Sequence, residues 1–257
     1  MDHLAPTTIG ALSLVALAAG TVDAIAGGGG LLTVPALLAA GLPPHLALGT
    51  NKGQSAFGSG VALYRFARGG LVDPARAAVG FPAGLLGALA GASLVQVVPP
   101  ATLRPVVLVL LGGAALFIGL RRGAPAGRAP ATPADPSRER WVVALVGLAI
   151  GAYDGFFGPG TGTFLIVAFV GLLGDGPARA SAAAKVVNFA SNLAALGLFA
   201  WRGLVLWPVA LPMAAGQLAG GWLGAHLAIR RGDALVRRVA VLVSLALAAK
   251  VALDLRG

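Results

Sequence analysis

Long apolar runs with few charges recur along the whole chain, separated by short polar or basic stretches. Most runs have about twenty residues, which as a helix span about 30 Å of hydrocarbon. Strands that cross a membrane are shorter and alternate polar with apolar residues, unlike these runs. The pattern therefore predicts an all-α integral membrane protein. The predicted segments cover residues 8–26, 31–41, 46–66, 78–98 and 103–120 in the first half, and 141–157, 161–173, 181–201, 206–229 and 237–254 in the second.

The second segment of each half is too short to cross a bilayer comfortably, at about 1.5 Å per helical residue. Each short segment follows an aspartate and a glycine-rich break: Asp23 precedes the glycines at 27–30, and Asp154 precedes those at 158–162. Helices broken part-way across the membrane are typical of binding sites in transporters. We therefore expect one short or broken helix in each half, beside a binding site.

The two halves repeat each other beyond this motif. Lys52 corresponds to Lys185, and Pro82 corresponds to Pro212. Between the halves lies a stretch rich in arginine and proline, which is typical of an exposed linker. The predicted organisation is a first transmembrane repeat over residues 1–120, a cytoplasmic linker over 121–140 and a second transmembrane repeat over 141–257.

The arginines predict the orientation of the segments. They gather after the third segment, in the linker and between the ninth and tenth segments, whereas the loops near Arg104 and Arg202 carry one basic residue each. Basic loops stay on the cytoplasmic side. The two repeats are then inverted with respect to each other, with both chain termini outside, as in many secondary transporters.

Composition agrees with a membrane protein: 57% of residues are hydrophobic and 11% are charged. A net charge of +10 is also found in proteins that bind nucleic acid. In this chain, however, the arginines lie between apolar segments, so we expect a lipid bilayer as partner and no nucleic acid. There is no cysteine, which excludes disulfides. Metal-ligand spacings, Walker motifs and Ser–His–Asp arrangements are lacking, so we expect no cofactor, no metal site, no enzyme and no ATP-driven pump.

Four ionisable residues lie deep within the apolar segments: Asp23, Lys52, Asp154 and Lys185. Such residues are costly in hydrocarbon and are candidates for function. Amides and hydroxyls follow both lysines at helical spacing, and the two short helices would add positive potential from their N-termini. These features suit a small anion. The predicted substrate-binding residues are Lys52, Lys185, Asn51, Ser55, Asn188, Asn192, Gly28, Gly29, Gly30, Gly160 and Thr161, with Asp23 and Asp154 as charge partners or proton carriers.

A plainer interpretation stays open for the charged residues. Each aspartate could neutralise a lysine, or cap a half-helix, and only hold the bundle together. Polar side chains on membrane helices also bond to one another without any ligand.

Several stretches together resemble one family: residues 22–35 (VDAIAGGGGLLTVP), 47–52, 153–162 (YDGFFGPGTG) and 184–192. They are similar to the sulfite exporter TauE/SafE family of bacterial inner-membrane permeases, in particular its probable membrane transporter branch. The resemblance implies a multi-pass inner-membrane protein that transports small anions, with sulfite and organosulfonates as the proposed cargo. It does not fix the cargo of this branch.

The predicted function is therefore a secondary transporter for sulfite, an organosulfonate or a related sulfur-containing or carboxylate anion, working by alternating access and coupled to protons or another ion. Two other hypotheses are an anion channel and an intramembrane aspartyl protease whose two aspartates share a proton. Against the protease, the glycines follow the aspartates, and a protease would not need matched lysines. The direction of transport and the formation of a homo-oligomer stay open.

Overall fold

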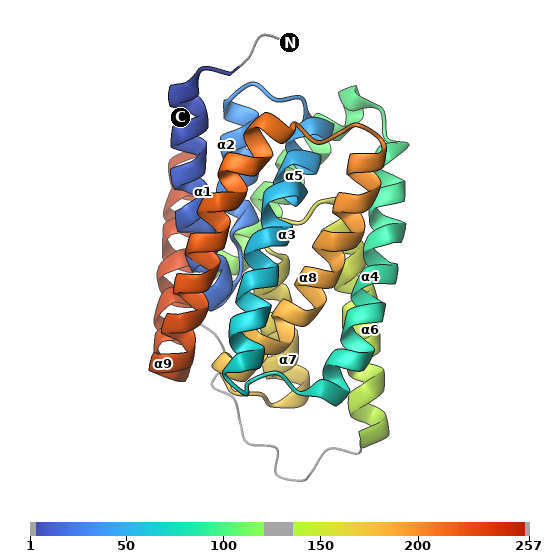
Figure 1. The fold of residues 1–257 in the computed structure, drawn as a ribbon, viewed down its shortest axis with the longest axis vertical. Helices are drawn as coiled ribbons and strands as arrows, with labels where there is room; N and C mark the ends of the chain where they lie inside the picture. Colours follow the sequence, from blue (N-terminus) through green and yellow to red (C-terminus); the bar gives the residue numbers. More distant parts are fainter. Residues whose placement is uncertain (1–3, 121–135, 255–257) are drawn as a thin grey trace.

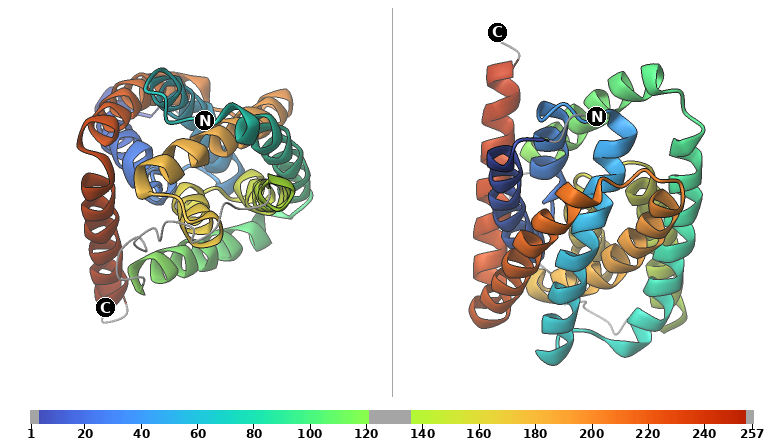
Figure 2. Two further views of the ribbon diagram at one scale, coloured as in Figure 1. Left: turned by 90° about the horizontal axis from the view of Figure 1, so that it is seen from below. Right: turned by 45° about the horizontal axis from the view of Figure 1, so that its top comes forward.

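The computed structural model describes residues 4–120 and 136–254, and in this part of the chain every regular element is an α-helix (Figures 1 and 2). The all-α fold is thereby confirmed. Each of the first eight predicted segments corresponds to one helix. The last two predicted segments are the two parts of α9, which are separated by the non-helical Gly232 (φ 57°, ψ −152°). The helices are α1 (Pro6–Ala26), α2 (Gly30–Ala39), α3 (Pro44–Arg68), α4 (Pro74–Gln96), α5 (Pro100–Leu120), α6 (Pro136–Phe156), α7 (Thr161–Leu173), α8 (Pro177–Trp201) and α9 (Trp207–Asp254).

Prolines set the start of many of these helices. A proline at the first helical position needs no partner for a backbone N–H, and it begins α1, α3, α4 and α8. The helix α6 also begins at a proline, Pro136, which lies inside the predicted linker. Residues 136–140, the last five of the predicted linker, are therefore helical. The rest of the linker, residues 121–135, lies outside the described residues.

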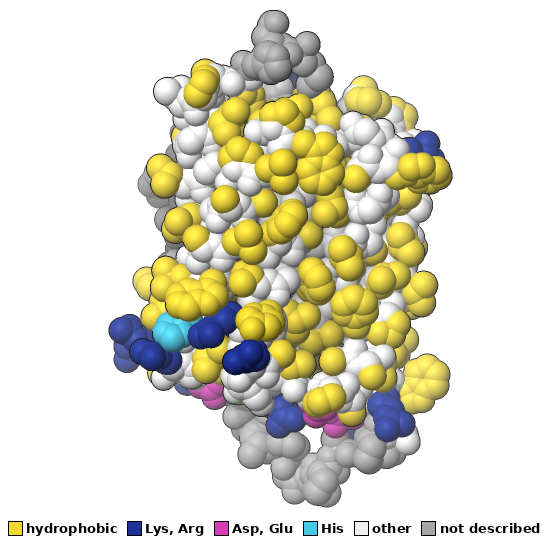
Figure 3. Space-filling view, in the orientation of Figure 1, with side chains coloured by type: hydrophobic (Ala, Val, Ile, Leu, Met, Phe, Trp, Pro, Cys, Tyr) yellow, Lys and Arg dark blue, Asp and Glu magenta, His cyan; other side chains and the backbone are white. Residues whose placement is uncertain are grey.

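The described helices include four that are long and apolar enough to cross a membrane, namely α1, α4, α8 and the Pro100–Ile118 part of α5. Apolar side chains cover the middle of the face drawn in Figure 3, while most lysine and arginine side chains on that face lie towards its lower end. An apolar belt of this kind is stable only against lipid. In α8, 67% of the most apolar stretch is buried, against 28–39% in the other three spans, which places α8 inside the bundle.

The halves exchange their packing partners. The first helix of each half packs along the fourth helix of the other, α1 on α9 and α6 on α4, and α3 contacts α8. Glycines allow this close approach: a Cβ on Gly220 of α9 would lie 2.1 Å from the carbonyl oxygen of Leu17, and one on Gly91 of α4 would lie 1.9 Å from that of Ala152. In Figure 1, α1 runs from the upper end downwards and α6 from the lower end upwards. This arrangement supports inverted repeats, which stay a prediction.

Ion pairs join several helices at the lower end of Figure 1. Arg76, in the first turn of α4, pairs with Glu139 on α6 and with Asp175 after α7 (N–O 2.6 Å for Asp175). Asp73 accepts hydrogen bonds at the start of α4 and pairs with Arg179 on α8 at 3.3 Å. The loop after α3 and the starts of α6 and α8 therefore lie at one end of the molecule. The cytoplasmic location of this end remains a prediction.

Candidate functional site

The two glycine-rich breaks meet in the middle of the bundle. Gly27 has a φ of 77°, and a Cβ there would lie 2.1 Å from the backbone nitrogen of Thr163, just inside α7. Thr163 in turn donates a hydrogen bond from its hydroxyl to the carbonyl of Ala26 at 3.1 Å. Both the backbone conformation and the lack of space require glycine at this position. The N-termini of α2 and α7 are thus held side by side.

A small polar cavity lies between these breaks and the central helices α3 and α8. The centre of a water molecule can occupy a volume of about 20 Å³ in this cavity. The cavity therefore has room for about one water. We call it the polar cavity. It is lined by Asp23, Gly29, Gly30, Asn51, Lys52, Ser55, Asp154, Gly158, Gly160, Thr161, Gly162, Asn188, Asn192 and Gln217.

One ion pair at the cavity joins α3 to α6. The ammonium of Lys52 lies 2.8 Å from Oδ1 of Asp154, and both side chains are only 2% exposed. Lys52 also donates to the amide oxygen of Asn192 at 3.1 Å. Asp154 accepts two further hydrogen bonds, from the hydroxyl of Thr161 at 2.9 Å and from that of Ser191. Both charges are therefore surrounded by partners, which a buried ion pair requires.

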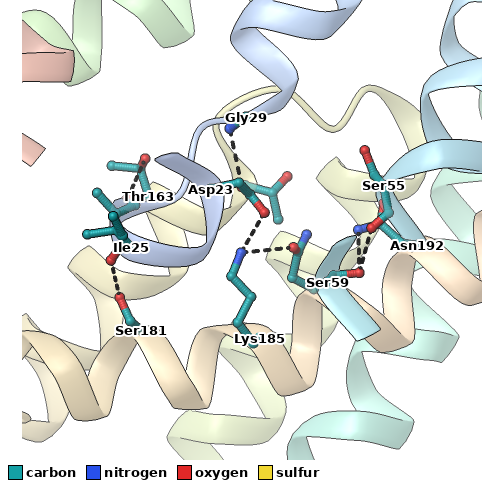
Figure 4. Close-up of polar contacts among 12 residues, drawn as sticks. Asp23, Ile25, Gly29, Ser55, Ser59, Thr163, Ser181, Lys185 and Asn192 are labelled. Carbon is teal, nitrogen blue, oxygen red and sulfur yellow. Dashed lines mark hydrogen bonds and ion pairs between the residues drawn. The ribbon is translucent and has the colours of Figure 1, made fainter. Parts of the chain in front are cut away.

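A second ion pair joins α8 to α1. The ammonium of Lys185 lies 2.6 Å from Oδ2 of Asp23, and it has a longer contact of 3.4 Å with the amide oxygen of Asn188. The other oxygen of Asp23 accepts the backbone N–H of Gly29, at the start of α2, at 3.2 Å. Figure 4 shows Lys185 and Gly29 on opposite sides of this carboxylate. Asp23 thus neutralises a lysine and also binds the N-terminus of a half-helix.

The two pairs connect the repeats crosswise, because each lysine binds the aspartate of the other half. With all four groups ionised, two positive and two negative charges cancel. The pairing of each aspartate with a lysine is the arrangement that the plainer interpretation of the sequence expects, and it is also compatible with a bound ligand. An anion would have to compete with a carboxylate for a lysine.

Most of the predicted substrate-binding residues meet at the polar cavity, but two do not line it. Lys185 is fully buried and reaches the cavity only through its partners Asp23 and Asn188. Gly28, with a φ of 91°, belongs to an apolar groove of about 370 Å³ formed with side chains such as Leu31 and Leu242. The positive φ at Gly28 turns the chain between Asp23 and α2, so the neighbouring glycines face different surfaces.

Several residues of the site were not predicted. Gly158, Gly162 and Gln217 also line the polar cavity, and Ser191 holds Asp154. The sequence offered a signal for Gln217, an amide inside an apolar segment, and for Ser191, in the polar stretch after Lys185. It offered no signal for Thr33, which donates its hydroxyl hydrogen to the amide oxygen of Asn51 at 2.6 Å and so fixes that cavity side chain.

Chemically, the polar cavity offers one ammonium and two carboxylates, together with amides, hydroxyls and the N-termini of two half-helices. The ammonium and the half-helix N-termini are groups that bind oxyanions in proteins.

Comparison with known proteins identifies the family and several relatives of the chain. The sequence model of the family described as sulfite exporter TauE/SafE matches residues 12–251. The chain is 41% identical to the Sinorhizobium protein named probable membrane transporter protein ORF9, over 99% of this chain and 96% of that protein. It is 38% identical to the probable membrane transporter protein YfcA of Escherichia coli, over 99% and 93% of the two chains. A probable membrane transporter protein of Haemophilus influenzae is also 38% identical, over 95% and 94%. No solved structure matches the chain significantly.

Proposed function

The chain belongs to the sulfite exporter TauE/SafE family, and on this premise we propose that it is a secondary transporter that carries a small anion by alternating access. It is a multi-pass protein of the bacterial inner membrane, like the relatives that are named membrane transporters. The proposed cargo is sulfite, an organosulfonate or a related sulfur-containing or carboxylate anion. In this proposal the transported anion is the ligand that binds in the polar cavity.

The observation that carries the proposal is the position of Lys52. Its ammonium lines the polar cavity at the point where both half-helices begin, although the side chain is 2% exposed and lies deep in an apolar bundle. An ammonium and two helix N-termini are groups that bind an oxyanion, once the anion competes with Asp154 for Lys52. Asn51, Ser55 and Asn188 add neutral hydrogen-bonding groups around it. Together they supply charge and orientation for a small oxyanion.

The closed state of the cavity also fits a carrier. Room for about one water is too little for a sulfonate, so the bundle must open before the anion enters. The exchanged packing of α1 on α9 and α6 on α4 supports two units that rock against each other around the cavity. Before it binds the anion, the protein keeps its lysines paired with aspartates, which avoids an unpaired charge in the membrane.

The two other hypotheses find less support. In an aspartyl protease, two carboxylates share a proton and activate one water, whereas here each aspartate is bound to its own lysine. An anion channel needs a continuous path, and the polar cavity is small. Flux that saturates with anion concentration would favour a carrier over a channel. Proteolysis of a membrane substrate, lost when either aspartate is changed, would instead favour the protease.

The test uses the full chain purified in detergent, with sulfite and methanesulfonate as probes. Calorimetry should detect binding to the wild type. The double variant Lys52→Gln/Asp154→Asn keeps the cavity neutral but lacks the ammonium, so its affinity should fall by about a hundredfold, which corresponds to about 2–3 kcal/mol.

Arg202→Gln serves as the matched control. Arg202 is exposed beside Trp201, after the end of α8, so this variant removes a positive charge away from the cavity and should bind like the wild type. Equal affinity of the double variant and the control would refute the site.

A further inference from the structure

We infer that Asp23 carries the proton that accompanies the anion, whereas Asp154 stays ionised throughout the transport cycle. The inference rests on the proposed function, since it assumes that an anion binds in the polar cavity. It goes beyond the repeated sequence, in which the two aspartates are equivalent. The difference between them comes from their surroundings.

The first difference is access. The side chain of Asp23 is 20% exposed, whereas that of Asp154 is 2% exposed. Both lysines are buried, but Lys52 lines the polar cavity, whereas Lys185 lies behind Asp23 and Asn188. Asp23 and Asp154 both line the cavity, so a ligand that enters it meets both carboxylates, of which Asp23 is the more exposed.

The second difference is the number of donors. Asp154 accepts from three side chains, Lys52, Thr161 and Ser191. A proton on Asp154 would weaken contacts to three side-chain donors, although each donor also has a second acceptor, namely Asn192 for Lys52, the carbonyl of Gly158 for Thr161 and the carbonyl of Asn188 for Ser191. Asp23 accepts from one side chain, Lys185, and from the N–H of Gly29 at 3.2 Å. The protein thus holds the charge of Asp154 more firmly.

The third argument is charge balance. Three charged side chains are described around Asp23, namely Lys185 from α8, Lys52 from α3 and Asp154 from α6. The neutral groups there are the N–H of Gly29 at the start of α2 and the amide of Gln217 from α9. An anion beside an ionised Asp23 would leave a net negative charge in a dry site. When Asp23 takes a proton from water, the anion in the polar cavity and the ionised Asp154 together balance the two lysines, and the site stays neutral. Anion and proton then bind together.

Methanesulfonate is the best probe for this coupling, because a sulfonate keeps its charge across the neutral range and any proton taken up belongs to the protein. Titration calorimetry of the detergent-purified chain in two buffers of different ionisation enthalpy gives the number of protons bound per anion. We expect a number that rises towards one as the pH increases. In the same range the Kd should increase about tenfold per pH unit.

The variants then assign the proton. Asp23→Asn should bind methanesulfonate with no proton uptake and with a Kd independent of pH, and the anion should raise its melting temperature more than that of the wild type, since Lys185 lacks another counter-charge. Asp23→Glu should restore proton uptake. Ser191→Ala removes a donor from Asp154 without touching Asp23 or the cavity, and it should leave the pH profile unchanged.

The outcomes separate the inference from the proposed function. Proton uptake that persists in Asp23→Asn would overturn the inference, as would a shifted pH profile in Ser191→Ala. If Asp23→Asn does not fold, the pH profiles of Asp23→Glu and Ser191→Ala decide, because only the first should shift. A wild type that binds the anion without taking up a proton contradicts the inference alone. A wild type that binds neither sulfite nor methanesulfonate contradicts the proposed function as well.

Discussion

The ammonium of Lys52 lies 2.8 Å from the carboxylate of Asp154, a residue 102 positions later in the other half of the chain. Its counterpart is the pair of Lys185 with Asp23, separated by 162 positions at 2.6 Å. These two contacts join the repeats at the place where both half-helices begin. Their energetics can be measured separately from transport.

Loss of one partner of the Lys52–Asp154 pair should destabilise the protein strongly. Lys52→Gln leaves Asp154 as a buried charge without its counter-ion, which typically costs about 3–5 kcal/mol. The double variant Lys52→Gln/Asp154→Asn should recover most of this loss, because no net charge remains. Melting temperatures of the wild type, both single variants and the double variant form the cycle. Additive effects of the two substitutions would mean that the pair is not coupled.

The topology predicts opposite accessibility of two sites. The chain has no cysteine, so single cysteines can be labelled without background. Thr7→Cys, at the exposed start of α1, should react with an impermeant reagent on cells whose outer membrane is permeable to it. Thr132→Cys, in the predicted cytoplasmic linker, should react only after the inner membrane is opened. The opposite result at both positions would contradict the predicted orientation.

Gly27→Ala should disrupt the contact between the two breaks. The residue has a φ of 77°, and the added Cβ would lie 2.1 Å from the nitrogen of Thr163. Backbone strain alone costs about 1–3 kcal/mol, and the half-helices must also separate. We expect a lower melting temperature and weaker binding of methanesulfonate. Gly112→Ala in α5 is the control, since a Cβ there meets nothing within 4 Å; it should be neutral or stabilising by up to about 1 kcal/mol.

Asp73, just before α4, should contribute stability that depends on pH. Burial by itself would raise the pKa of Asp73, but the N–H groups of Arg76 and Ala75 and the charges of Arg76 and Arg179 together lower this pKa below its ordinary value of 3.8. Because the folded-state pKa is the lower one, the contribution is complete above pH 3.8 and is lost as the pH falls through the folded-state pKa. Thermal unfolding between pH 3 and pH 6 measures it.

Two variants separate the cap from the charge of Asp73. Asp73→Ala removes the acceptor for the first N–H groups of α4 and should cost about 1 kcal/mol at neutral pH. Asp73→Asn keeps an acceptor and loses the negative charge, and with it the attraction to Arg76 and the partly exposed ion pair with Arg179 at 3.3 Å, so its cost should be below about 1 kcal/mol. An equal loss in both variants would show that charge, and not capping, is the main contribution.

The sequence by itself determined the local features of this protein. Apolar runs of membrane length defined the helices, and prolines and glycines defined their ends, because helix formation depends mainly on neighbouring residues. The same local signals identified the breaks before α2 and α7. The cost of charges in hydrocarbon marked Asp23, Lys52, Asp154 and Lys185 as special without any knowledge of their partners.

Only the tertiary structure decided how these four residues combine. A repeated sequence gives both aspartates similar neighbours along the chain, so it cannot tell which lysine each one meets or which carboxylate is the more exposed. Those properties arise where α1 and α6 cross α8 and α3, through contacts between residues more than a hundred positions apart. Packing left Asp23 partly exposed and enclosed Asp154 among three donors. It also placed Gly28 beside the apolar side chains of the groove and Gln217 at the polar cavity, because the surroundings of a residue depend on the neighbouring helices.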